Sequence, residues 1–103
     1  MYYMKKSEQE HMYTAALKYH ASSAEIDLEM VEINAAVEDM SRFSVLYDRY
    51  YVRIFRFIYQ RMADADRSAD ITSRVFLRAM LNLRGYRHKG FPFASWLYRI
   101  ARN

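Results

Sequence analysis

Two glycines and one proline in 103 residues leave this chain few places at which the backbone can turn sharply. Sandwiches and barrels need many tight turns, and tight turns depend largely on these residue types. The three breakers, Gly85, Gly90 and Pro92, also stand close together near the C-terminal end. Since 52% of the residues are hydrophobic, the chain is too apolar to remain disordered. The sequence therefore predicts a single all-α domain.

The first half of the chain predicts an arm followed by two helices. Residues 1–21 are polar with scattered tyrosines, and we expect a mobile N-terminal arm there. Ser22 and Glu25 have the spacing of a capping box, which places a helix start at this point. An acidic amphipathic helix then runs to about residue 40, and a second helix with a wide apolar stripe spans about 41–62.

The second half predicts two further helices joined by a basic loop. Asp64 and Asp66 suit the N-terminus of a third helix, which we expect to end at Gly85. Pro92 suits the first position of a fourth helix. No capping glycine follows before Asn103, so we expect this last helix to be truncated at the C-terminus of the sequence.

Facing apolar stripes of the last three helices define the expected core. Its predicted members are Leu46, Tyr50, Ile54, Phe57, Val75, Phe76, Met80, Phe93, Trp96, Leu97 and Ile100.

Charge is divided unevenly along the chain. Residues 1–40 carry three lysines and eight acidic residues, net −5, whereas residues 41–103 carry thirteen basic and four acidic residues, net +9. Twelve of those thirteen are arginines, whose planar multi-donor guanidinium suits phosphates and base edges. A polyanion is therefore the expected partner. No apolar run approaches the ~20 residues that cross a bilayer, and no signal peptide is recognisable, so we expect a cytoplasmic protein without a membrane partner.

No set of residues has the pattern of a catalytic or metal site. The chain has no cysteine, which excludes disulfides and thiolate ligands. Glu8 and His11 have the spacing of a di-iron ligand pair, but such a site needs a second pair and two more glutamates. The acidic run from Asp64 resembles a calcium loop, except that Ala69 replaces its glycine and Val75 its bidentate glutamate. We expect no enzyme activity, no metal and no cofactor.

The basic loop has the composition of a single-strand binder, because cations alternate with an aromatic ring. Its residues are Arg84, Tyr86, Arg87, His88 and Lys89. The connection from Leu83 to Pro92 is too long for a helix-turn-helix, which disfavours major-groove reading.

Two further features have two interpretations each. The stripe of Arg49, Arg53 and Arg56 could bind phosphates, but a solvated outer face is common on any surface helix. Phe93 and Trp96 could stack on bases, but their helical spacing is also that of core residues.

Three strings of the sequence resemble region 2 of bacterial sigma factors, most closely the extracytoplasmic-function class. They are FSVLYDRYY at 43–51, DITSRVFLRA at 70–79 and PFASWLYRIARN at 92–103. The resemblance implies that residues 22–103 form a compact bundle of three to four helices. It also implies a transcription initiation role, with docking on the clamp helices of the largest catalytic subunit of RNA polymerase and recognition of the promoter minus-ten element as a melted, non-template single strand.

The resemblance assigns two groups of site residues and a further partner. The polymerase-binding face is Asp70, Ser73, Arg74, Leu77 and Arg78. The resemblance implies Arg87, His88 and Lys89 of the loop and Ser95, Arg99 and Arg102 of the last helix as DNA-binding residues. Arg84 and Tyr86, from the loop composition, and Trp96, from its possible base stacking, complete the predicted set. An anti-sigma protein is a further partner that the resemblance suggests.

The polymerase-binding face departs from the family pattern at one place. The family's usual Gln-Glu pair is Ser73 and Arg74 in this chain, which removes an amide and reverses a charge. The alternative to an initiation factor is thus a sigma-like interaction or regulatory module that has lost polymerase docking. A third reading is a single-strand or RNA binder without sequence preference.

Overall fold

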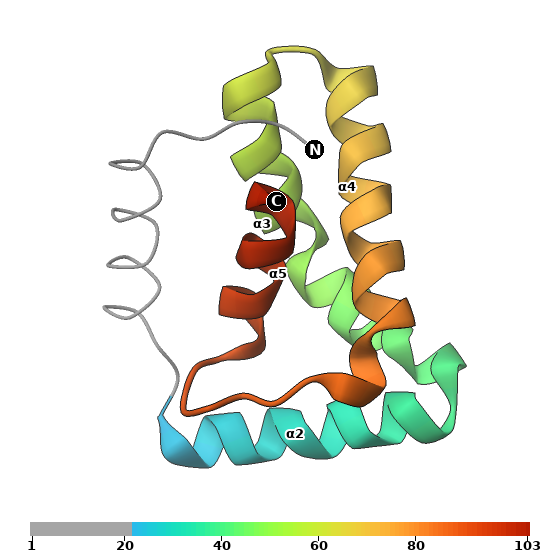
Figure 1. The fold of residues 1–103 in the computed structure, drawn as a ribbon, viewed down its shortest axis with the longest axis vertical. Coiled ribbons are helices and arrows are strands. Elements are labelled where there is room, and N and C mark those ends of the chain that lie inside the picture. Colours follow the sequence, from blue (N-terminus) through green and yellow to red (C-terminus); the bar gives the residue numbers. More distant parts are fainter. Residues whose placement is uncertain (1–21) are drawn as a thin grey trace.

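The structure is a computed structural model that describes residues 22–103, so the arm expected over residues 1–21 lies outside the described part. Figure 1 shows its four α-helices, α2 (Ser23–Glu38), α3 (Ser44–Met62), α4 (Ala65–Leu81) and α5 (Phe93–Arg102). Two short 3-10 helices accompany them, η1 (Met40–Phe43) before α3 and η2 (Leu83–Gly85) after α4. No strand occurs among residues 22–103, and the predicted all-α helical bundle is confirmed.

The helices form a three-helix unit with a fourth helix across one end. α3 and α4 run antiparallel to each other, and α5 packs against both (Figure 1). α2 lies across the end of this unit, where it contacts η1, α3 and η2. The connection from η2 to α5 runs alongside α2 (Figure 1). None of the helices within residues 22–103 is both long and apolar enough to span a bilayer.

Both helix starts that depend on local caps are confirmed. The Ser22 hydroxyl accepts a hydrogen bond from the Glu25 N–H, and the Glu25 carboxylate accepts one from the Ser22 N–H, each at 3.2 Å. At the start of α4, the Asp64 carboxylate accepts a hydrogen bond from the Arg67 N–H at 3.0 Å. These bonds satisfy amides that a helix leaves without partners in its first turn.

The prediction of one continuous helix over 41–62 is wrong at its beginning. Residues Met40–Phe43 form η1, and α3 starts only at Ser44. The cause is Asp39, whose carboxylate accepts hydrogen bonds from the Ser41 N–H at 3.1 Å and the Ser41 hydroxyl at 2.7 Å. This cap starts a separate short turn between α2 and α3.

Two other boundaries also differ from the prediction. α4 ends at Leu81 and not at Gly85, because the Asn82 side chain donates a hydrogen bond to the Arg78 carbonyl at 2.8 Å and satisfies the helix end. Pro92 is the extended N-cap of α5, with ψ 160°, and not its first helical residue. α5 therefore begins without a side-chain cap of its own.

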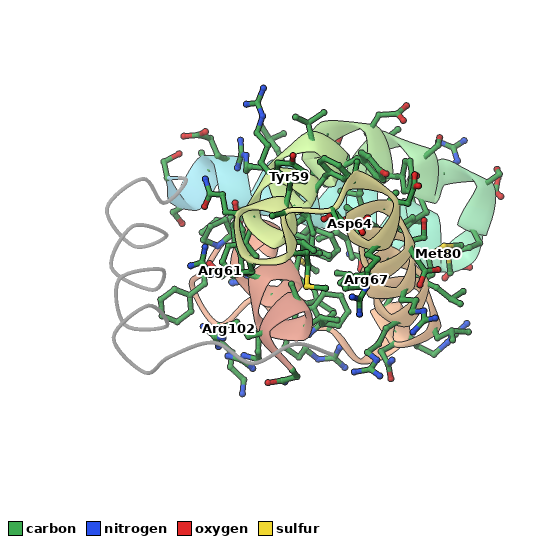
Figure 2. The ribbon with its side chains drawn as sticks, turned by 90° about the horizontal axis from the view of Figure 1, so that it is seen from above. Tyr59, Arg61, Asp64, Arg67, Met80 and Arg102 are labelled. Atoms are coloured by element: carbon green, nitrogen blue, oxygen red, sulfur yellow. The ribbon has the colours of Figure 1, made fainter. Side chains whose placement is uncertain are left out.

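The buried core contains most of the predicted residues and also several that the prediction lacked, among them Phe43, Ile58 and Leu83. Nine of the eleven predicted residues are buried, whereas Trp96 and Met80, which lies at the edge of the bundle in Figure 2, are only partly buried. α2 adds Ile33 and Ala36, which the predicted core lacked. Phe76 is 2% exposed and occupies the α3–α4 interface, where its ring meets those of Phe43, Tyr47 and Tyr51.

Candidate nucleic-acid interface

A pocket of about 270 Å³ opens between the basic loop and the first two turns of α5. Three cations and three aromatic residues line it, together with smaller side chains: Arg87, Lys89, Arg99, Tyr86, Phe91 and Trp96. Among residues 22–103, no acidic side chain lines it. The volume lies just below the roughly 300–1,000 Å³ of small-molecule sites, so the pocket suits a single planar ring.

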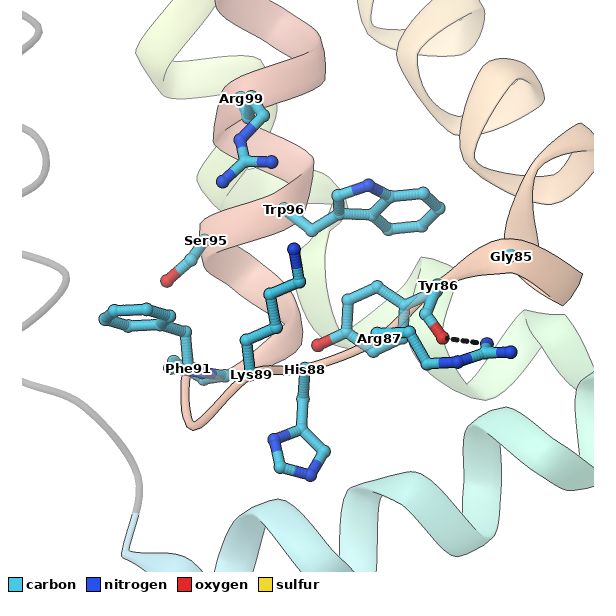
Figure 3. Close-up of a pocket in the computed structure, with 10 residues that line it drawn as sticks. Gly85, Tyr86, Arg87, His88, Lys89, Phe91, Ser95, Trp96 and Arg99 are labelled. Carbon is cyan, nitrogen blue, oxygen red and sulfur yellow. Dashed lines mark hydrogen bonds between the residues drawn. The ribbon is translucent and has the colours of Figure 1, made fainter.

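A tight turn at 88–91 shapes the mouth of this pocket. Lys89 and Gly90 both have positive φ, 51° and 84°, and the Phe91 N–H donates to the His88 carbonyl at 2.9 Å. The Gly90 N–H also donates to Nδ1 of His88 at 2.8 Å. Figure 3 shows the consequence: the His88 ring points toward α2, whereas the Lys89 side chain extends toward Trp96. A positive φ at a lysine is uncommon and costs conformational energy, a pattern that clusters at functional sites.

The aromatic residues of the pocket have different exposures. Tyr86 is only 6% exposed, because its ring packs edge-on against Phe93 at 5.2 Å and lies 4.9 Å from the ring of Trp96. Burial, and next the charge of Glu29, raise the pKa of Tyr86 above its ordinary value. Phe91, in contrast, is 44% exposed. Tyr86 therefore forms an inner wall, while Phe91 is the ring at the rim that a ligand can reach.

Arg87 supports the loop as well as lining the pocket. Its Nη1 donates hydrogen bonds to the Tyr86 carbonyl at 2.8 Å (Figure 3) and to the Arg84 carbonyl at 3.3 Å. These bonds hold the guanidinium against the backbone where η2 ends. The charge of Arg87 is thus fixed in place beside the pocket.

Ser95, in the first turn of α5, lines the pocket with an unsatisfied hydroxyl. Its Oγ is shielded from solvent and has no hydrogen-bond partner within the described part of the chain. A buried polar group without a partner is costly and rare in folded proteins. A ligand in the pocket can satisfy this hydroxyl only if the Ser95 side chain turns toward it.

The structure gathers most of the predicted DNA-binding residues around one pocket. Seven of the nine line it: Tyr86, Arg87, His88, Lys89, Ser95, Trp96 and Arg99. Arg84 is exposed on η2 and Arg102 lies in the last turn of α5, and neither lines the pocket. The prediction missed Phe91, although an aromatic residue between Gly90 and Pro92 belongs to no helical stripe and therefore signals a role outside the core.

Glu29 of α2 fixes the helix on which the pocket is built, a role that the sequence did not reveal. Its Oε1 accepts a hydrogen bond from the Phe93 N–H at 3.2 Å, and so supplies the cap that Pro92 cannot give to α5. Its Oε2 accepts from Nη1 of Arg49 at 2.9 Å and from the hydroxyl of Tyr50. With its side chain 12% exposed, this carboxylate joins α2, α3 and α5 at one point.

The contacts around Glu29 shift the pKa values of Tyr50, Arg49 and Glu32 in consistent directions. Burial, and then the hydrogen bond to Glu29, raise the pKa of Tyr50. Arg49 also pairs with Glu32 through Nη2 at 2.7 Å, and this hydrogen bond lowers the pKa of Glu32 and raises that of Arg49. The cluster therefore favours a charged Arg49 and a neutral Tyr50 phenol.

The five residues predicted to bind polymerase share one exposed side of α4. Nη2 of Arg74 pairs with Oδ2 of Asp70 at 3.0 Å, with both side chains more than half exposed. Leu77 is 56% exposed, and Leu81, which the prediction missed, is 75% exposed one turn later. Spacing of four residues on a helix is the signal that could have added Leu81.

Residues 22–103 contain no group of three or more His, Asp or Glu side chains placed to hold a metal. In the acidic run after α3, the Asp64 carboxylate caps α4. The pair Glu8 and His11 lies outside the described residues.

Comparison with known proteins gives a consistent family assignment. Residues 46–103 match the family described as sigma-70 region 2. The chain is 37% identical over 76 residues to ECF RNA polymerase sigma factor BldN of Streptomyces coelicolor, covering 74% of this chain and 28% of that protein. It is 31% identical over 65 residues to ECF RNA polymerase sigma factor SigW of Bacillus subtilis, covering 63% of this chain and 34% of that protein.

The matched segment corresponds to part of these relatives, since the chain spans about a third or less of their length. No solved structure matches the chain. The family match covers the helices α4 and α5, the pocket between them and nearly all of α3. The chain thus belongs to the sigma-70 family of the ECF class, and carries its region 2 domain.

Proposed function

We propose that this domain acts in a cytoplasmic, non-enzymatic transcription initiation factor, in which the pocket beside α5 holds an unpaired base of the promoter minus-ten element. The observation that carries the proposal is the pocket lining, which combines aromatic rings with cations and includes no acidic residue from 22–103. Stacking surfaces and phosphate-neutralising charges are the two requirements for binding a separated strand. The names of the two relatives, both RNA polymerase sigma factors, agree with this role.

The individual side chains suit different parts of a nucleotide. Phe91 at the rim can stack on a base, and the Ser95 hydroxyl can bond to a base edge once its side chain turns into the pocket. Lys89 extends toward Trp96 (Figure 3), and its ammonium can neutralise the phosphate of a nucleotide whose base enters the pocket. The pocket has the size for one ring, which fits an extruded base and not a duplex groove.

The exposed side of α4 is the proposed contact with the clamp helices of the polymerase. Leu77 and Leu81 give it an apolar centre, and Asp70, Arg74 and Arg78 surround that centre with charges. An apolar centre with a charged rim is the usual anatomy of a protein interface.

Fluorescence anisotropy tests the pocket. Single-stranded oligonucleotides are first enriched from a random pool on the purified chain, and an enriched sequence is compared with its scrambled version. Phe91→Ala should cost roughly 1–3 kcal/mol on the enriched sequence and less on the scrambled one. Lys89→Ala should flatten the logarithmic salt dependence by about 0.7 without changing the sequence preference.

Matched controls separate the pocket from general surface effects. Tyr59 is also 44% exposed but lies on α3 outside the pocket, so Tyr59→Ala should leave both affinities unchanged. Equal affinity of the wild type for enriched and scrambled sequences would instead support a single-strand binder without sequence preference. If neither Phe91→Ala nor Lys89→Ala alters binding, the pocket is not the site.

A second candidate function follows from the Arg74 pair. Arg74 forms an ion pair with Asp70 at 3.0 Å on the side of α4. At the position of Arg74 the family usually has a glutamate, so this chain presents a paired arginine in place of a negative charge. This arrangement favours a sigma-like interaction module that no longer docks on polymerase. A pull-down with core RNA polymerase at micromolar concentration decides: retention supports the initiation factor, and absence of retention supports the interaction module.

A further inference from the structure

A second basic concavity lies between α3 and α5, apart from the pocket. Its volume is about 390 Å³, and its polar lining consists of three arginines, an amide and a phenol: Arg49, Arg53, Arg56, Gln60 and Tyr98. As at the pocket, no acidic residue of the described part of the chain lines it. We call it the arginine groove.

The arginines of this groove are not neutralised alike. Arg49 is held by Glu29 and Glu32 at its end of the groove, at 2.9 and 2.7 Å. Arg53 and Arg56 form no ion pair with any carboxylate of residues 22–103. The guanidinium of Arg53 lies 5.4 Å from the centre of the Tyr50 ring, which orients it without cancelling its charge. Within residues 22–103, the groove thus carries two cations, Arg53 and Arg56, without a carboxylate partner.

The outer face of α5 connects the groove with the pocket. Successive residues of an α-helix are rotated by about 100° around its axis. On this basis four side chains share an arc of about 100°, in the order Tyr98, Arg102, Ser95 and Arg99. Tyr98 lines the arginine groove, and Ser95 and Arg99 line the pocket. Arg102, which lies in neither, falls between them on this arc. In Figure 2 it lies toward the same side of the molecule as Arg61 of α3.

We propose that the arginine groove binds the phosphates of the same DNA strand whose base enters the pocket, with Arg102 on the path between the two. This inference rests on the proposed function. Arginine, glutamine and tyrosine are all frequent donors to phosphate oxygens, and such contacts position a strand without reading its sequence. Arg102 connects the groove to the pocket along the face of α5. This connection favours the strand already bound at the pocket as the ligand of the groove, because a separate acidic protein would not require a connection between the groove and the pocket.

Salt dependence of binding tests the groove. A short oligonucleotide, cut from the enriched sequence around the nucleotide that enters the pocket, is compared with two longer ones of about twelve nucleotides, which extend it on the 5′ or the 3′ side. The double variant Arg53→Gln/Arg56→Gln should flatten the logarithmic salt slope by about 1.4 for one of the longer oligonucleotides, 0.7 for each cation removed. The short oligonucleotide should bind as it does to the wild type.

The matched control removes two exposed cations elsewhere, Arg42 on η1 and Arg67 on α4, neither of which lines the groove. Arg42→Gln/Arg67→Gln should leave the slopes unchanged, and circular dichroism melting checks that both double variants fold. An unchanged slope for both longer oligonucleotides, or an equal loss for the short one, overturns the groove proposal while the pocket stands. If the wild type binds no single strand at all, both the groove proposal and the proposed function fail.

Discussion

Replacing Glu29 by glutamine tests whether one carboxylate holds the pocket helix in place. The substitution keeps the size of the side chain but replaces two charged acceptor oxygens by one neutral amide oxygen. Three donors then compete for that oxygen: the Phe93 N–H, the Tyr50 hydroxyl and the Arg49 guanidinium. Hydrogen bonds to charged groups contribute about 1.5–3 kcal/mol each. Arg49 retains Glu32 at 2.7 Å, so the bonds from Tyr50 and Phe93 are the ones weakened. We expect a loss of about 2–4 kcal/mol in the free energy of unfolding.

Urea unfolding followed by circular dichroism measures this loss. With a slope of about 2 kcal/mol per molar urea, the middle of the usual range, the midpoint should fall by about 1–2 M. Hydrogen exchange adds a local measurement, because the Phe93 amide should lose protection in the variant. Glu32→Gln is the matched control: Glu32 also pairs with Arg49, but both side chains are more than a third exposed, so its loss should stay below about 1 kcal/mol. Equal losses for the two variants, with Phe93 still protected, would refute the role of Glu29 as the cap.

Three further predictions concern the core, the α4 face and alkaline pH. Phe76→Ala should cost roughly 3–5 kcal/mol, since the ring is 2% exposed, and a melting temperature equal to that of the wild type would contradict this. Arg74→Glu restores the family's charge and should tighten binding to a clamp-helix fragment in titration calorimetry; weaker binding would indicate an acidic partner residue. Burial is the largest cause that raises the pKa of Tyr50, Tyr86 and Tyr98, so their folded state holds protons that the unfolded state loses above about pH 10. These groups should leave the free energy of unfolding unchanged below about pH 10. Above about pH 10 each should lower it by up to about 1.4 kcal/mol per pH unit. The urea midpoint of Tyr98→Phe should therefore fall less steeply with rising pH than that of the wild type.

Local signals in the sequence predicted much of the fold. The Ser22 and Asp64 caps act within three residues, so their spacing alone revealed them. The end of α4 was predicted too late, because the capping bond from Asn82 competes with a glycine signal three residues beyond it. Periodicity also placed Trp96 in the core, although a wide ring at the edge of a bundle is only partly buried. Local rules thus predicted which helices form more accurately than the residues at which those helices begin and end.

The site depended more on contacts between distant parts of the chain. The loop composition and the family resemblance together named seven of the residues that line the pocket. Neither could show that Tyr86 turns inward against Phe93, because the direction of a loop side chain follows from packing. The bond between Glu29 and Phe93 joins positions 64 residues apart, and no spacing rule reaches that far. The turn at Lys89 and Gly90 likewise follows from backbone geometry that composition does not specify.

The cap from Glu29 also bears on how this domain can be divided. The family match begins at Leu46, yet the acceptor for the first amide of α5 comes from α2, outside the matched span. A fragment cut at residue 46 would lose that acceptor, and it would uncover the surfaces of α3 and η2 that α2 covers. The span matched by the family model and the part of the chain that anchors the pocket helix therefore begin at different residues: a piece that keeps the acceptor for the Phe93 N–H must include α2.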